Sequence, residues 1–116
     1  MGINNKEMNK LKEEFFQSAN KYGDALEQGN HKVANRHHKE LMNLYKKIKQ
    51  NNYWDLIENN LNESSDYVKL WAATFLLKTN ETVALNTLKE LSKSDKIIGL
   101  TAETTINMWN QGMIDI

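Results

Sequence analysis

The histidines of this chain and the carboxylate near them are the residues best suited to chemistry. His37 and Glu40 form a His-x-x-Glu pattern, a spacing that places an imidazole and a carboxylate on one face of a helix. Such a pair supplies two metal ligands, but a site needs a third and a fourth, and no other residue has suitable spacing. Glu27 and His31 are separated by an expected helix break. The pattern therefore favours a packed or half-exposed His37 and a solvated His38, and we predict no metal site.

Nucleophilic catalysis has few candidate residues in this sequence. The chain contains no Cys, and it lacks the Gly-x-Ser-x-Gly turn that exposes an activated serine. Its five Gly are scattered, so no glycine-rich loop is available to hold a phosphate. Adjacent carboxylates such as Glu13 and Glu14 are typical of a solvated helix surface. We therefore predict a protein that is not an enzyme and uses no cofactor.

The elements that carry these residues are all expected to be helices. The chain contains no Pro, and it has no alternating run of Val, Ile and Thr that would indicate a strand. Apolar residues instead recur every three or four positions, which predicts an all-α fold of about six helices. The expected helices cover residues 5–28, 31–50, 53–61, 67–78 and 96–111. Another helix, the fifth along the chain, is expected to be capped at residues 80–81 and to end at residues 94–95.

The first two helices are expected to form a long hairpin over residues 5–50. Gly29 suits the left-handed position after the first helix, and Asn30 suits the N-cap of the second. A connection this short makes the two helices antiparallel. Asn52 is expected to cap the third helix, and Ser65 lies in the break that caps the fourth.

The second half of the chain carries an internal repeat. The helix expected over residues 67–78 is apolar on all sides, which is typical of a central, buried helix. A shift of 30 residues places it on the sixth helix. The aligned pairs are Val68 with Ile98, Leu70 with Leu100, Ala72 with Ala102, Thr74 with Thr104, and Leu76 with Ile106. This period predicts two HEAT-like helix pairs over residues 52–112, a short α-solenoid within a single domain of residues 1–116.

The charge of the chain is unevenly spread although its formal net charge is zero. Residues 1–51 carry ten cations against six acids, and residues 52–116 carry five Lys against nine acids. The basic face of residues 6–49 suits phosphate contacts, so nucleic-acid binding is one hypothesis for the function. Acids interleave this stretch, and its single Arg is a poor supply of the forked contacts that nucleic acids favour. Nucleic-acid binding is therefore the alternative hypothesis.

The location expected from the sequence is the cytoplasm. No apolar run approaches the roughly 20 residues that span a bilayer. The first residues lack the apolar region of a signal peptide, and the absence of Cys suits a reducing compartment. We expect no membrane partner.

Several stretches resemble a known family. They are residues 29–36 leading into 41–45, residues 68–77, residues 84–88 and residues 99–109. Together they resemble small bacterial helical-repeat proteins catalogued as a domain of unknown function. Members of that family are often found beside polymorphic or contact-dependent toxins, where they look like immunity proteins. The resemblance covers nearly the whole chain and implies a cytoplasmic protein that binds and neutralises a cognate toxin domain.

The acidic second half is the surface predicted to meet the toxin. Nuclease toxins are basic because their substrate is anionic, and an acidic inhibitor would speed the encounter. The candidate partner-binding residues are Asp55, Glu58, Glu63, Asp66 and Glu103, with Trp54 and Trp109 as anchors. Trp71 is expected to lie in the core instead. A scaffold or oligomerisation module is a third hypothesis, and the sequence leaves the oligomeric state open.

Overall fold

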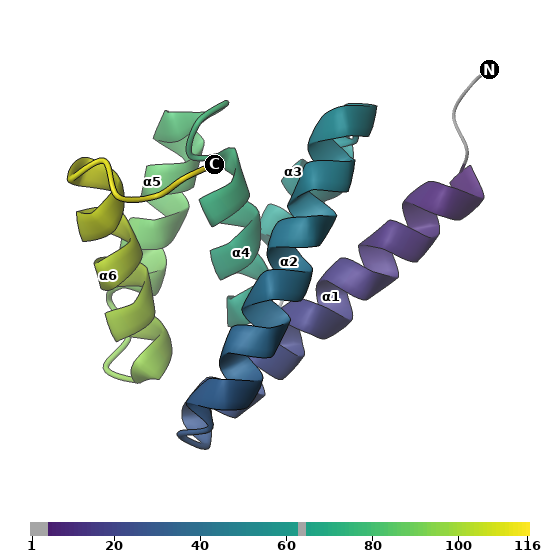
Figure 1. The fold of residues 1–116 in the computed structure, drawn as a ribbon. Coiled ribbons are helices and arrows are strands. Elements are labelled where there is room, and N and C mark those ends of the chain that lie inside the picture. Colours follow the sequence, from purple (N-terminus) through teal and green to yellow (C-terminus); the bar gives the residue numbers. More distant parts are fainter. Residues whose placement is uncertain (1–4, 63–64) are drawn as a thin grey trace. The chain divides into compact units, whose positions relative to one another are not determined.

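The computed structural model describes residues 5–62 and 65–116, and all regular structure in these residues is helical (Figure 1). The elements are α1 (Asn5–Glu27), α2 (His31–Asn51), α3 (Trp54–Asn59), the 3₁₀ turn η1 (Asn60–Asn62), α4 (Asp66–Leu76), α5 (Glu81–Leu91) and α6 (Ile97–Asn110). This order confirms the predicted all-α fold with about six helices. None of the described helices is long and apolar enough to cross a membrane.

Contacts within the chain define two compact units, Met1–Leu56 and Ile57–Ile116, with the boundary inside α3. The first unit contains α1, α2 and the start of α3. The second unit contains the end of α3, η1, α4, α5 and α6. The hairpin predicted over residues 5–50 lies entirely in the first unit.

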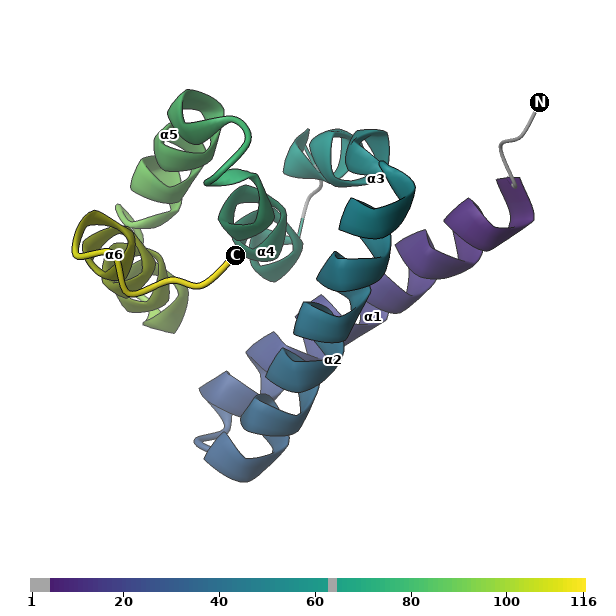
Figure 2. The ribbon, with the colours of Figure 1, turned by 45° about the horizontal axis from the view of Figure 1, so that its top comes forward.

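In the first unit, α1 and α2 pack against each other and run antiparallel from a tight turn (Figure 2). Gly29 takes a left-handed φ of 72°, and the Asn30 side chain accepts a 3.2 Å hydrogen bond from the Val33 backbone N–H. Both residues therefore have the roles predicted for them. Phe15 of α1 and Leu41 of α2 are among the fully buried side chains of this unit.

The end of α2 differs from the prediction. Asn52 was expected to cap α3, but it ends α2 with a left-handed φ of 58°. Its backbone N–H donates to the Lys49 carbonyl, and the next N–H, of Tyr53, donates to the Ile48 carbonyl at 2.9 Å. Asn adopts the left-handed region more readily than most residues, so it can end a helix, and its side chain can also cap the start of the next one.

In the second unit, α4 packs against α5, η1 and α6, and α5 also packs against α6. Buried side chains lie on every side of α4, which confirms the prediction of a helix buried all round. Trp71 is one of them, as predicted, and its ring lies 5.6 Å from that of Phe75, centroid to centroid. The Ser65 hydroxyl begins α4 by accepting a hydrogen bond from the Val68 N–H at 3.4 Å.

The turn between α5 and α6 lies against the start of α6. Gly99 is buried there, and a Cβ on it would lie 2.8 Å from the carbonyl carbon of Ser94 and closer still to the carbonyl oxygen. The Ser94 hydroxyl also accepts a 3.1 Å hydrogen bond from the Lys96 N–H. This close approach requires a residue without a side chain at position 99.

The residue pairs of the predicted repeat are not equally buried. Ala72 and Ala102 are both fully buried. Leu70 is 1% exposed, whereas Leu100, its partner in the alignment, is 67% exposed. The HEAT-like repeat stays a prediction, and the exposed side of α6 is the main difference between the two helices.

Candidate binding surfaces

Six of the seven predicted partner-binding residues lie in the described part of the chain, and these six are distributed over both units. Trp54 and Asp55 lie on α3 in the first unit, whereas the other described ones lie in the second. Glu63 lies outside the described residues. The acidic ones in the described part of the chain, Asp55, Glu58, Asp66 and Glu103, are all exposed.

The two predicted anchors, Trp54 and Trp109, are half-buried and make contacts within their own units. The Trp109 indole N–H donates a 2.7 Å hydrogen bond to Glu81 Oε2, which joins the end of α6 to the start of α5. The Trp54 ring packs edge-on against Tyr45 with 6.0 Å between the centroids. Glu103 and Trp109 are six residues apart on α6, which places them roughly 120° apart around the helix. The structure therefore does not bring these two predicted site residues onto one face.

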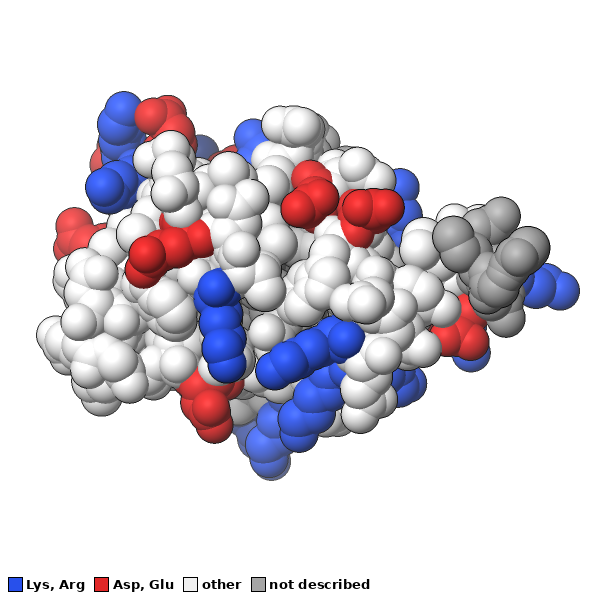
Figure 3. All heavy atoms as spheres, turned by 90° about the horizontal axis from the view of Figure 1, so that it is seen from above, with Lys and Arg blue, Asp and Glu red and all other residues white. Residues whose placement is uncertain are grey.

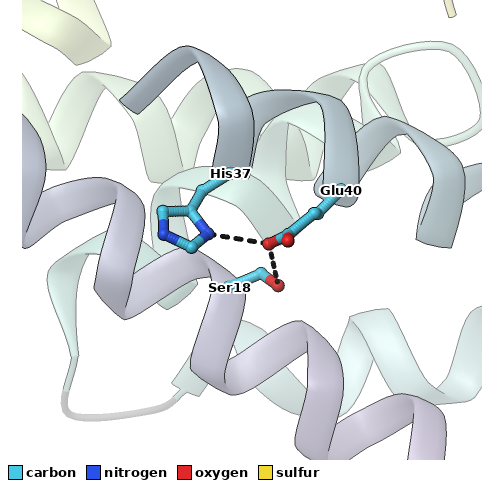
Figure 4. Close-up of polar contacts among 3 residues, drawn as sticks. All are labelled: Ser18, His37 and Glu40. Carbon is cyan, nitrogen blue, oxygen red and sulfur yellow. Dashed lines mark hydrogen bonds and ion pairs between the residues drawn. The ribbon is translucent and has the colours of Figure 1, made fainter. Parts of the chain in front are cut away.

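His37, Glu40 and Ser18 form a polar cluster between α1 and α2 (Figure 4). His37 Nδ1 lies 2.7 Å from Glu40 Oε1, and the Ser18 hydroxyl donates to the same oxygen at 3.4 Å. His37 is only 7% exposed, which confirms that it is packed. The hydrogen bond from His37 is the main cause that lowers the pKa of the Glu40 carboxyl, and the Ser18 hydroxyl acts in the same direction.

The order of contacts in this cluster differs from that of a Ser-His-carboxylate triad. In such a triad the serine hydroxyl donates to the imidazole, and the carboxylate orients that imidazole. Here the Ser18 hydroxyl donates to Glu40 Oε1, and His37 contacts the same oxygen. In residues 5–62 and 65–116, no three His, Asp or Glu residues are grouped as metal ligands would be. The cluster is a polar contact that joins the two helices of the hairpin.

His38, which follows His37 in α2, is exposed but lies close to Tyr22 of α1. The two ring centroids are 6.5 Å apart. Burial lowers the pKa of the His38 imidazole and raises the pKa of the Tyr22 phenol. The neutral form of each ring is therefore favoured at this contact.

α6 presents an uncharged face to solvent. Leu100 is the most exposed large apolar residue of the described chain at 67%, and Ile97 and Met108 are 39% and 37% exposed. At 100° per residue these three positions, with Thr101 and Thr104 between them, lie within roughly 100° of the helix circumference. The 30-residue repeat aligns Leu100 with Leu70 and so predicts a core position for it. The sequence therefore does not reveal that this face of α6 is exposed.

The excess positive charge of the first half lies on one helix. α1 carries four Lys and five acids, whereas α2 carries six cations and one acid, Glu40. Acidic and basic side chains both reach solvent on the face drawn in Figure 3. The net positive charge expected over residues 6–49 therefore lies on α2.

No family model, curated protein or solved structure matches this chain. The resemblance to toxin-associated helical-repeat proteins stays a prediction.

Proposed function

We propose that this protein is a non-catalytic module that binds another protein through the uncharged face of α6. The exposure of Leu100 is the observation that carries this proposal. Large apolar side chains grouped on a surface are typical of protein-binding sites. Covering a leucine that is two-thirds exposed contributes about 1–2 kcal/mol to association, which favours a partner over solvent at this face.

The predicted repeat supports the same surface. In the alignment of α4 with α6, Leu100 corresponds to Leu70, and Leu70 is almost completely buried. If the two helices are related, α6 exposes a face that its counterpart covers. A partner protein would then complete at α6 the packing that α4 already has.

We further propose that the partner is a toxin domain and that this chain is its immunity protein. The second unit carries five Lys against eight acids, so its net charge is −3. A nuclease toxin with an apolar patch inside a basic surface would complement both the uncharged face of α6 and this charge. The family resemblance supports this assignment, and the HEAT-like architecture belongs to the same proposal.

The experiment measures, by calorimetry, binding of the purified chain to the C-terminal region of any large secreted protein that a neighbouring gene encodes. We expect nanomolar affinity, and we expect Leu100→Lys to weaken it at least tenfold. Asn110→Lys places the same charge on an exposed position on another side of α6, so it should bind as the natural chain does. Helicity measured by circular dichroism should be unchanged in both variants because both positions are exposed.

Two results would contradict these proposals in different ways. Equal affinities for Leu100→Lys and the natural chain would exclude the α6 face as the site. Absence of binding, together with no protection of cells that express the toxin region, would exclude the immunity function.

A further inference from the structure

The solvent face of α2 carries a regular stripe of cations. Lys32, Arg36, Lys39 and Lys46 are all exposed and are spaced by four, three and seven residues. At 100° per residue they lie within roughly 80° of the helix circumference, along about 21 Å of its length. Exposed amides fill the positions that continue this spacing, at Asn43 and Gln50. We refer to Lys32, Arg36, Lys39 and Lys46 as the α2 stripe.

The α2 stripe is not part of the packed face of α2, although the charge of Arg36 helps to lower the pKa of the nearby Glu40 carboxyl. The buried residues of α2, including Leu41 and Ile48, lie on the opposite side of the helix. Within the described part of the chain, none of the four stripe cations forms an ion pair with a carboxylate. Like charges three and four residues apart destabilise a helix, so the stripe acts against the stability of α2. An external anion would remove this repulsion.

We propose that the α2 stripe binds the phosphate backbone of a nucleic acid without reading its sequence. Lys and Arg spaced along a straight helix suit a linear row of phosphates, and the amides of Asn43 and Gln50 can donate to phosphate oxygens. A single Arg offers little capacity for the paired contacts that recognise guanine, which fits backbone binding. This surface lies in the first unit and is independent of the α6 face.

The composition of the stripe distinguishes a nucleic acid from other anionic partners. Protein interfaces are depleted in Lys at their centres and anchored by aromatic side chains, whereas the stripe and the positions that continue it hold only cations and amides. An amphipathic helix binds a membrane by inserting its apolar side, but the apolar side of α2 is already packed in the hairpin.

The test is fluorescence anisotropy of a labelled 20-base-pair duplex of mixed sequence, titrated with the full chain between 50 and 200 mM KCl. Four phosphate contacts predict a slope of about −3.6 for log affinity against log salt, so affinity should fall roughly 150-fold over this range. Replacing all four stripe cations by Gln should abolish the binding that the natural chain shows at 50 mM KCl.

The matched control replaces the four Lys of α1, at positions 6, 10, 12 and 21, by Gln. It changes the net charge by the same amount in the same unit but leaves the stripe intact. Its affinity for the duplex should stay within about threefold of the natural chain, because binding depends on the position of the charges. Circular dichroism checks that both variants remain helical, as expected when exposed cations become Gln.

Three outcomes would overturn the proposal. The first is no binding of the duplex by the natural chain at 50 mM KCl. The second is an equal loss of affinity in the α1 and α2 variants, which would show a general charge effect. The third is stripe-dependent binding to phosphatidylserine vesicles or to an acidic polypeptide that is tighter than binding to the duplex.

Discussion

Replacing Gly99 by Ala should destabilise the second unit, although the same change in most helices is stabilising. Gly99 lies in the first turn of α6, where Ala is favoured over Gly by about 1 kcal/mol in helix propensity. Here the added methyl group would meet the backbone of Ser94, 2.8 Å from its carbonyl carbon and closer to its oxygen. The obstacle is backbone, so no side-chain rotation can relieve it.

The expected size of the effect follows from these two opposing terms. Forcing a methyl group into a packed site costs about 1–3 kcal/mol or more, because the surrounding structure must shift. The turn between α5 and α6 would have to move away, and the hydrogen bond from the Lys96 N–H to Ser94 would be strained. Because the contact is with backbone, the cost should lie in the upper part of this range, about 2–3 kcal/mol. After the gain of about 1 kcal/mol in helix propensity, we expect a net loss of roughly 1–2 kcal/mol, which corresponds to a fall in Tm of roughly 4–16 °C for a unit of this size.

The assay is thermal unfolding followed by circular dichroism, with Thr104→Ala as the control. Thr104 is exposed on the same helix, so its replacement changes helix propensity without a steric contact and should leave Tm unchanged or slightly higher. A Gly99→Ala variant as stable as the natural chain would refute the reasoning. It would show that the turn yields at no cost and that Gly99 is not required by the close approach.

Three further predictions concern pH, a surface hydrogen bond and the core. The pKa values of the His38 imidazole and the Glu40 carboxyl are lowered by folding. The free energy of unfolding in urea should therefore decrease as pH falls below about 6.5, where His38 takes up a proton in the unfolded chain, and again below about 4.5, where Glu40 does. The His38→Gln variant should lack the first decrease, and the Glu40→Gln variant should lack the second. Trp109→Phe should lower the free energy of unfolding in urea by about 0.5–1.5 kcal/mol, because it removes the bond to Glu81. Phe75→Ala should cost about 3–5 kcal/mol in calorimetry, because Phe75 is fully buried.

The helices could be predicted from the sequence because burial leaves a local periodic pattern. The apolar spacing in α1 and α2 and the Gly29–Asn30 turn determine the hairpin, and both appear in the chain as short-range signals. The assignment of Asn52 failed because one residue type serves two purposes. Asn caps the start of a helix with its side chain and ends one by adopting a left-handed backbone, and the sequence Asn51–Asn52 does not distinguish them.

The surfaces were harder to predict because exposure depends on which neighbours a helix has. Leu70 and Leu100 occupy equivalent positions in the sequence repeat, yet one is buried and the other is exposed. An apolar residue at a core spacing shows only that the position can be buried. The excess of cations on α2 is present in the sequence. It becomes apparent only when charges are counted for each helix, and for each position around the helix axis, rather than for each half of the chain.

The α6 face and the α2 stripe should respond differently to salt, which allows their binding to be separated in one set of experiments. The contacts that Leu100 would make with the proposed partner are apolar, so the dissociation rate of that complex should change little between 50 and 200 mM KCl. The acidic charge of the second unit would act on the association rate, which salt reduces by screening the approach of a basic partner. Binding of a phosphate backbone to the stripe depends on counterion release, so its equilibrium affinity should fall steeply over the same range. A steep dependence of the dissociation rate in the Leu100-dependent complex would show that charged contacts, and not the uncharged face, hold that partner.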